Sequence, residues 1–328
     1  MNIEDIKNTI ICGDALTELK KFPDESIDCV ITSPPYFNLR NYKVEGQIGL
    51  EKTYQEYIKK LIDVFNEIKR ILKKEGTCFV NLGDSYNNHN WAGNKLNKFA
   101  SQTITPKNIV FGRGGDLGLP DKSLMLIPHR FAIAMLDNGW RLRNTLIWIK
   151  PNAMPESVQD RWKKAHEYIF FFTKSKKYYF NLDTIRTPHK QVSIQRAQYE
   201  LGRNAMGLNP SSMGKKYQDN KRYMGMPAKM VKLNPKGAIP PDYLIVNTNC
   251  SKNDGSESHY AIYPQELISP LILAGCPKNG ITLDPFGGSG TTGVVAKKLG
   301  RNYILIDLNP KYCEIARQRI AAQPNPLF

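Results

Sequence analysis

The stretch Ser33-Pro34-Pro35-Tyr36 contains residue types that could hold a planar ring bearing an amino group. Ser33 offers a hydroxyl, and the two consecutive prolines stiffen the backbone and leave carbonyl groups without neighbouring N–H donors. Tyr36 adds an aromatic face on which a ring could stack. A nucleobase with an exocyclic NH2 group fits this description. Taken alone, the stretch is more typical of a loop that ends a strand, so this interpretation needs a second signal.

A glycine-rich turn near the end of the sequence provides that signal. It follows an apolar run at 280–283 and consists of Asp284-Pro285-Phe286-Gly287-Gly288-Ser289-Gly290-Thr291-Thr292. A strand, a glycine turn and a helix together bring backbone N–H groups close to a ligand. The turn has neither the glycine spacing of dinucleotide sites nor the Gly-Lys-Thr of phosphate loops. Asp284 would repel a pyrophosphate but could accept a hydrogen bond from an amine, and S-adenosylmethionine carries an α-ammonium and a ribose.

Two further carboxylates follow predicted strands. Asp307 ends the apolar run 303–307, and an acid at the end of the second strand of such a unit commonly accepts hydrogen bonds from ribose hydroxyls. Asp14 follows the apolar run 9–12, where it could bind a ligand or cap the next helix, and the residues alone leave both options open.

Apolar runs and periodicity predict an α/β protein whose sheet is covered on both faces. We expect strands at 9–12, 27–31, 76–82, 141–149, 167–173, 280–283 and 303–307. Helical spacing predicts helices at about 53–74, 124–138, 265–274 and 293–299, and a short helix opening at 13–16. The polar segment 85–122 is too long for an ordinary connection, so it is either a ligand-contacting loop or a surface insertion.

The charge balance indicates a polyanionic partner. Lys and Arg outnumber Asp and Glu by 46 to 30, which gives a net charge of +16. No apolar stretch approaches a bilayer-spanning length and the start lacks a signal-peptide core, so we expect a cytoplasmic protein without membrane contact. The 6 cysteines are scattered without the paired spacing of zinc sites, which predicts buried free thiols and no bound metal.

The middle of the chain is the most basic part. Residues 190–236 contain ten Lys and Arg against two acids, and tyrosines lie among them. This composition is typical of a nucleic-acid contact surface, although a generic solvated or disordered basic segment would have a similar composition.

The corner at 33–36 and the glycine turn at 284–292 together resemble the motifs of the amino-group DNA methyltransferases, which methylate cytosine at N4 or adenine at N6. Their order, with the basic segment between them, resembles the circularly permuted β group of that family. The loop 150–157 and the stretch 259–264 match the family as well.

The resemblance implies a Rossmann-like S-adenosylmethionine-dependent methyltransferase fold, circularly permuted, with an inserted target-recognition region. Residues 1–180 would form the catalytic half with its long loop 85–122, residues 181–257 the target-recognition region, and residues 258–328 the cofactor-binding half. The strand that ends near Leu283 would then lie at the centre of the sheet beside the strand that leads to Ser33.

The resemblance also assigns roles to residues. Ser33, Pro34, Pro35 and Tyr36 would form the catalytic corner. The cofactor S-adenosyl-L-methionine would contact Asp14, His259, Tyr260, Pro264, Asp284, Phe286, Gly287, Gly288, Ser289, Gly290, Thr291, Thr292 and Asp307. Duplex DNA would contact basic residues, for which we select Arg40, Arg196, Arg203, Lys215, Lys216, Lys221 and Arg222.

The implied reaction is methyl transfer to the exocyclic N4 of a flipped cytosine, because serine before Pro-Pro-Tyr usually accompanies cytosine in the family and aspartate accompanies adenine. N6-adenine methylation by the same site is the alternative. No Pro-Cys dipeptide is present, only Cys276-Pro277 in the reverse order, which argues against methylation at a ring carbon. A monomer or homodimer would act in the nucleoid, and a paired restriction endonuclease would be a partner without physical attachment.

Three other classes compete with this prediction. An enzyme of the same fold could act on RNA or on protein amides, a silent module could bind DNA without catalysis, and an oxidoreductase could use a nicotinamide cofactor. The basic middle segment favours DNA over the first class, and the glycine pattern disfavours the last.

Overall fold

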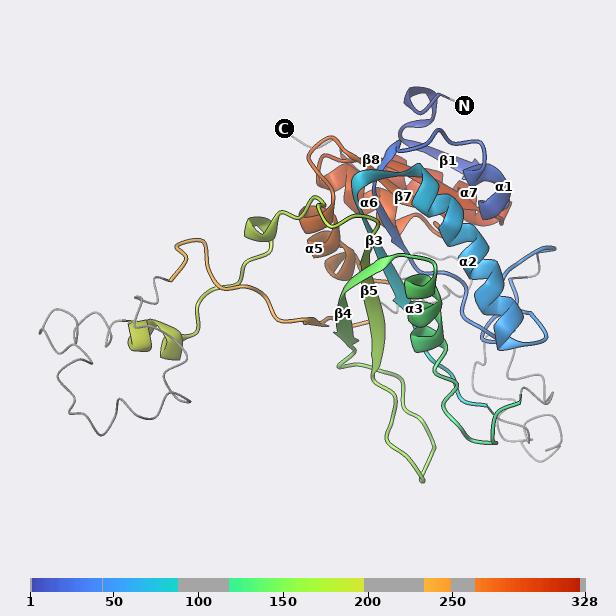
Figure 1. Ribbon diagram of the computed structural model, residues 1–328, viewed down its shortest axis with the longest axis horizontal. Helices are drawn as coiled ribbons and strands as arrows, with labels where there is room; N and C mark the ends of the chain where they lie inside the picture. Colours follow the sequence, from blue (N-terminus) through green and yellow to red (C-terminus); the bar gives the residue numbers. More distant parts are fainter. Residues whose placement is uncertain (1, 43, 88–117, 198–232, 249–262, 325–328) are drawn as a thin grey trace, which may run out of the picture. The chain divides into compact units, whose positions relative to one another are not determined.

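The computed structural model describes residues 2–42, 44–87, 118–197, 233–248 and 263–324. These residues divide into two compact units, one formed by 1–181 with 242–328 and the other by 182–241. The larger unit contains an eight-stranded sheet with strand order β1-β8-β7-β2-β3-β5-β4-β6 (Figure 1). Its strands are β1 (Thr9–Cys12), β2 (Ile27–Thr32), β3 (Leu72–Leu82), β4 (Arg141–Ile149), β5 (His166–Thr173), β6 (Tyr243–Ile245), β7 (Ile281–Asp284) and β8 (Asn302–Asp307).

All neighbouring strands of this sheet are parallel except at β5, which is antiparallel to both β3 and β4. The expected neighbour relation is confirmed, because β7 pairs with β2 through Cys29↔Thr282 and Val30↔Leu283. Parallel strands place their carboxyl ends at one edge. The ends of β2 and β7, and hence the corner and the glycine turn, therefore meet at that edge.

Helices cover both faces of the sheet (Figure 1). Alternate β2 residues point to opposite faces, so Val30 packs in the cluster containing α2 side chains, whereas Cys29 and Ile31 pack with α5. One face carries α1 (Ala15–Leu19), α2 (Tyr54–Ile71) and α3 (Ile127–Asp137), and the other carries α5 (Gln265–Gly275), α6 (Thr291–Lys298) and α7 (Pro310–Ala321). The three-layer arrangement confirms the expected α/β class.

Several helix boundaries differ from the sequence prediction, and the largest differences are at the end of α2 and the start of α3. The α2 helix ends at Ile71 and not at residue 74, because Leu72 turns to extended backbone and pairs with Ile27 of β2. The α3 helix begins at Ile127 and not at residue 124, because Leu126 adopts a left-handed conformation and Asp84 accepts a hydrogen bond from the Ile127 N–H.

One α-helix and one strand of the larger unit were not predicted. Helix α7 is capped by the Asn309 side chain and has Pro310 in its first turn, a recognised start signal. The short β6 pairs in parallel with β4, although it lies inside the range 181–257 that we expected to recognise DNA.

The smaller unit, 182–241, contains η3 (Leu182–Thr184) and a helical segment at 191–197. Its ends are joined by the bridge between Thr187 and Ala238 and by the ion pair between Asp183 and Lys236.

Cys29, Cys78, Cys276 and Cys313 are buried free thiols, as predicted, but Cys12 at the end of β1 is exposed. Within the described ranges, no helix combines the length and apolarity needed to cross a bilayer. The same ranges contain no cluster of three or more His, Cys, Asp or Glu suited to a metal ion.

Candidate active site

The corner after β2 has the geometry of a small acceptor site. Pro34 is buried and Ser33 is half-buried. The Tyr57 hydroxyl of α2 donates to the Pro35 carbonyl at 2.8 Å and fixes the turn. None of the described residues donates a hydrogen bond to the Pro34 carbonyl. Ser33 and the Pro34 carbonyl thus remain as acceptors at the end of the strand.

Tyr36 bonds to Glu167, which in turn contacts side chains from neighbouring parts of the sheet. Its hydroxyl donates to Glu167 Oε2 of β5 at 2.6 Å, and Asn81 Nδ2 of β3 donates to the same oxygen at 3.0 Å. Lys150 forms an ion pair with Glu167 Oε1. Burial, together with the nearby Glu167 charge, raises the pKa of the Tyr36 phenol well above its ordinary value, so the phenol stays protonated. Although the aromatic ring of Tyr36 is only half-buried, its hydroxyl lies inside this network.

Asp284 links the corner to the glycine turn. Its Oδ1 accepts from the Thr32 hydroxyl at 2.7 Å and from the Phe286 N–H at 3.1 Å. Its Oδ2 accepts from the hydroxyls of Tyr263 and Thr292, each at 2.6 Å. Because a carboxylate has about four acceptor positions, these four contacts leave none for a ligand amine. Burial raises the pKa of Asp284 above its ordinary value, against the lowering effect of the donors.

The glycine turn packs tightly between β8 and α7. Gly287 N–H donates to the Ile306 carbonyl at 2.8 Å, and Gly290 adopts a left-handed φ of +86° just before α6. The Arg319 guanidinium of α7 holds Ser289 by its carbonyl and hydroxyl at 2.6 and 2.5 Å. Thr291, at the start of α6, has a buried hydroxyl for which the described residues provide no partner.

Asp307 and Asp14 lie at the ends of adjacent strands. Asp307 ends β8 and pairs with Cys12, the last residue of β1, and Asp14 follows Cys12 by two residues. Asp307 accepts from the N–H groups of Gly288 and Asn309, each at 2.8 Å, and burial raises its pKa. Asp14 caps α1, with its Oδ1 accepting from the Thr17 N–H at 2.9 Å and hydroxyl at 2.7 Å. Asp14 is therefore a helix cap, and none of the described residues donates to its second oxygen, Oδ2.

The other predicted residues are divided between the described and undescribed parts of the chain. Phe286 packs against the core and Pro264 is the buried residue before α5. Arg40 lies next to the hydroxyl of Tyr42. Burial raises the pKa of Tyr42, Arg40 lowers it, and the nearby Asp307 carboxylate raises it further. Arg196 belongs to the smaller unit. Outside the described residues are His259, Tyr260, Arg203, Lys215, Lys216, Lys221 and Arg222.

Sequence reasoning missed the polar side chains around Tyr36. Glu167 and Asn81 each lie inside a run otherwise composed largely of apolar residues, and an acid or amide in such a run must find partners when buried. That signal was readable, but which residues they contact depends on strand pairing. The missed Tyr263 belongs to the stretch 259–264, and its hydroxyl bonds to Asp284.

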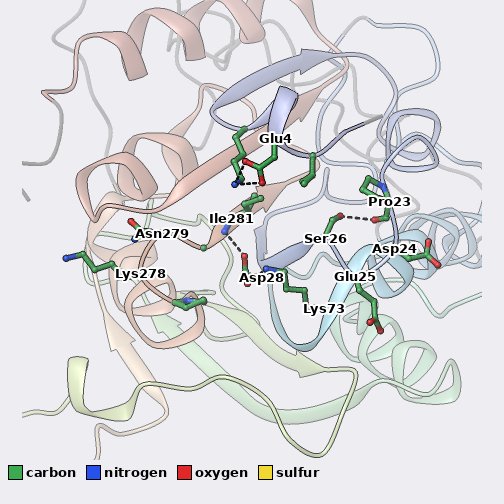
Figure 2. Close-up of a pocket in the computed structure, with 14 residues that line it drawn as sticks. Glu4, Pro23, Asp24, Glu25, Ser26, Asp28, Lys73, Lys278, Asn279 and Ile281 are labelled. Carbon is green, nitrogen blue, oxygen red and sulfur yellow. Dashed lines mark hydrogen bonds and ion pairs between the residues drawn. The ribbon is translucent and has the colours of Figure 1, made fainter.

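A cavity of about 550 Å³ lies at the opposite edge of the sheet, before β2 and β7 (Figure 2). Two charged side chains that line it are bonded within the chain, since Lys73 pairs with Asp28 at 2.7 Å and Asp28 accepts from the Ile281 N–H at 2.9 Å. Open α/β sheets bind ligands at the carboxyl ends of strands. This cavity is therefore separate from the corner and the glycine turn.

Comparison with known proteins agrees with the motifs. A family model described as DNA methylase, for N6 and N4 methyltransferases, matches residues 27–318. The type II methyltransferase M.XycI of Xanthomonas campestris pv. cyanopsidis is 37% identical, with 96% of this chain and 88% of that protein covered. M.SmaI of Serratia marcescens, also a type II methyltransferase, is 36% identical over 95% of this chain and 90% of its own length.

Solved structures share the fold. The cytosine-N4-specific PvuII DNA methyltransferase superposes with a TM-score of 0.62 at 20% identity, covering 97% of this chain and 87% of that one. A putative DNA modification methylase of Thermus thermophilus, complexed with S-adenosyl-L-methionine, gives a TM-score of 0.55 at 20% identity, covering 96% of this chain and 93% of that one. The expected Rossmann-like methyltransferase fold is confirmed, and the chain belongs to the N6/N4 DNA methylase family.

Proposed function

We propose that the chain transfers a methyl group from S-adenosyl-L-methionine to the exocyclic N4 of a cytosine flipped out of duplex DNA. The observation that carries this proposal is the meeting of the Ser33 and Pro34 acceptors with the glycine turn at the carboxyl ends of paired strands. Family membership supports DNA methylation, and a serine in the corner favours cytosine over adenine.

The acceptors at the corner address the main obstacle of the reaction. The lone pair of an exocyclic amine is delocalised into its ring, which makes the nitrogen a poor nucleophile. If Ser33 Oγ and the Pro34 carbonyl accept the two N–H groups, the lone pair can localise as the transition state forms. The partly buried Tyr36 would stack on the base with its aromatic ring. When bound, the cofactor supplies an electrophilic methyl group on a sulfonium.

The residues around the glycine turn suit this cofactor. The N–H groups of the glycines in the turn are bonded within the chain, so the start of α6 would hold the carboxylate of the cofactor. Asp307 would accept from ribose hydroxyls and Asp14, through Oδ2, from the adenine amine. Asp284, with its acceptor positions filled by the chain, would position the site without touching the ligand.

DNA would approach from the edge that carries the corner. The loop between β4 and β5 extends beyond this edge (Figure 1), and its Trp162 and Met154 side chains are 93% and 79% exposed. An exposed tryptophan can stack on a base or fill the gap left by a flipped one. The cations proposed to contact phosphates are Arg40, Arg196, Arg203, Lys215, Lys216, Lys221 and Arg222.

The decisive experiment is nucleoside analysis. Duplex DNA incubated with the protein and S-adenosyl-L-methionine is digested, and N4-methylcytosine is expected. N6-methyladenine as the sole product would overturn the choice of base, and methylation of RNA or protein alone would overturn the substrate.

Ser33→Ala tests the role of the corner. We expect the variant to lose methyl transfer and to keep cofactor affinity, because the Ser33 hydroxyl serves the amine and not the cofactor. The matched control is Ser269→Ala in α5, where the hydroxyl bonds to its own helix at the Gln265 carbonyl. Equal activity of the two variants would contradict the proposed role of Ser33.

A further inference from the structure

The Ser33 hydroxyl has an orientation problem that a carboxylate would not have. A hydroxyl both donates and accepts, so it presents lone pairs to an amine only when its own hydrogen is directed elsewhere. In this structure, Ser33 Oγ donates toward the Tyr36 hydroxyl oxygen at 3.5 Å. This distance is long for a hydrogen bond between oxygens, and catalytic hydrogen bonds of this kind often shorten when substrate binds.

The Tyr36 hydroxyl can accept from Ser33 because its own hydrogen is already committed. It donates to Glu167 Oε2 at 2.6 Å, and an ionised carboxylate can only accept. The phenolic oxygen therefore turns its lone pairs toward Ser33.

Other side chains hold Glu167 in this role. Lys150 pairs with Oε1, and its ammonium lies 4.2 Å from the centre of the Trp148 ring. Asn81 donates to Oε2 at 3.0 Å. Asn81 lies on β3, Glu167 on β5 and Lys150 directly after β4, so the contacts that hold the carboxylate come from the sheet and from the residue next to it.

We propose that Glu167 is a positioning residue that acts through Tyr36 and makes the Ser33 hydroxyl a hydrogen-bond acceptor for the target amine. The inference rests on the proposed function and deepens it, because it explains how a neutral serine can do the work of an acceptor. It does not depend on whether the amine belongs to cytosine or adenine.

Glu167→Gln tests the orientation directly. Lys150 and Asn81 both donate to Glu167, and the charged Lys150 is the stronger donor. The glutamine therefore turns its carbonyl toward Lys150 and its NH2 toward Tyr36, which also removes the bond from Asn81. The Tyr36 hydroxyl must then accept from the NH2 group and redirect its hydrogen toward Ser33. Tyr36 then donates to Ser33 instead of accepting from it, and the Ser33 oxygen lone pair that would accept from the target amine is occupied.

The assay is single-turnover methylation of duplex DNA at saturating cofactor. We expect Glu167→Gln to slow the step on the order of tenfold to a hundredfold, as a misplaced catalytic group does, with cofactor and DNA affinities within about twofold. Tyr36→Phe, which removes only the hydroxyl, should slow it similarly, and the double variant should be no slower than Tyr36→Phe alone. The matched control is Glu314→Gln on the exposed face of α7.

Two results would overturn the proposal: a wild-type single-turnover rate in Tyr36→Phe, or effects of the two changes that multiply in the double variant. Tyr36→Phe keeps the test valid if Glu167→Gln does not fold, which urea unfolding would reveal. Failure of the proposed function is distinguishable, because it would appear as absent or different methylation by the wild-type protein itself.

Discussion

Two glycines of the turn have the same backbone handedness but different surroundings. Gly288 and Gly290 have φ values of +51° and +86°, in the left-handed region that side chains disfavour. A Cβ at Gly290 would lie 2.7 Å from the Cβ and 3.0 Å from the Cα of Ala316 in α7, whereas a Cβ at Gly288 would meet no atom within 4 Å. Alanine at these two positions therefore separates backbone strain from steric clash.

The expected losses of unfolding free energy follow from these distances. The left-handed conformation costs an alanine about 1–2 kcal/mol at either position. Gly290→Ala must also displace helix α7, and overpacking of this kind adds about 1–3 kcal/mol. We therefore expect Gly290→Ala to lower the unfolding free energy by about 2–5 kcal/mol and Gly288→Ala by about 1–2 kcal/mol.

Relative to its effect on stability, Gly288→Ala should weaken cofactor binding more than Gly290→Ala does. The open space at Gly288 is where the proposed ligand would approach the backbone, so Gly288→Ala should weaken S-adenosyl-L-methionine binding out of proportion to its small effect on folding. Urea unfolding without cofactor and calorimetric titration with it measure the two quantities. Equal destabilisation by both variants, or wild-type cofactor affinity in Gly288→Ala, would refute the reasoning.

Two more predictions concern the buried carboxylate and the exposed tryptophan. Burial raises the pKa of Asp284 in the folded state, so the folded protein binds a proton at this carboxyl more tightly than the unfolded chain does. The unfolding free energy of the wild type, relative to that of Asp284→Asn, should therefore fall as the pH rises above about 4. Urea unfolding of both proteins between about pH 4 and 7 checks this, and a pH-independent difference would contradict it. Trp162→Ala should weaken DNA binding by about 1–3 kcal/mol, the usual contribution of one stacked base, with cofactor affinity unchanged. Fluorescence anisotropy with a labelled duplex measures the loss, and wild-type affinity would exclude Trp162 from the interface.

The elements that were predictable from the sequence are those with dense local signals. The strand before Ser33 is a short apolar run ended by two prolines, and the β7 turn is defined by its glycines. Each pattern is specified within about ten residues, so neither requires knowledge of distant contacts. The family resemblance implied that they lie at one edge of the sheet, and the pairing of β2 with β7 confirms this adjacency.

The contacts that could not be predicted depend on register between distant strands. Glu167 reaches Tyr36 only because β5 runs antiparallel beside β3, which places Asn81 opposite Ile169 and brings the Glu167 side chain to the corner. Shifting that register by one residue would turn Glu167 to the opposite face of the sheet. The strand β6 was missed for a related reason, since three residues carry too little periodicity to identify a strand.

Asp284 shows how motifs far apart in the sequence are held in one geometry. The backbone pairing of β2 with β7 ends at Val30↔Leu283, before either motif begins. Beyond it, the Thr32 hydroxyl donates to Asp284 at 2.7 Å, and the same carboxylate accepts from Tyr263 and from Thr292 at the start of α6. Rigid placement within about 0.5 Å is what transfer between two bound molecules requires. The buried carboxylate therefore acts together with the backbone ladder to fix the distance between the amine acceptors and the glycine turn.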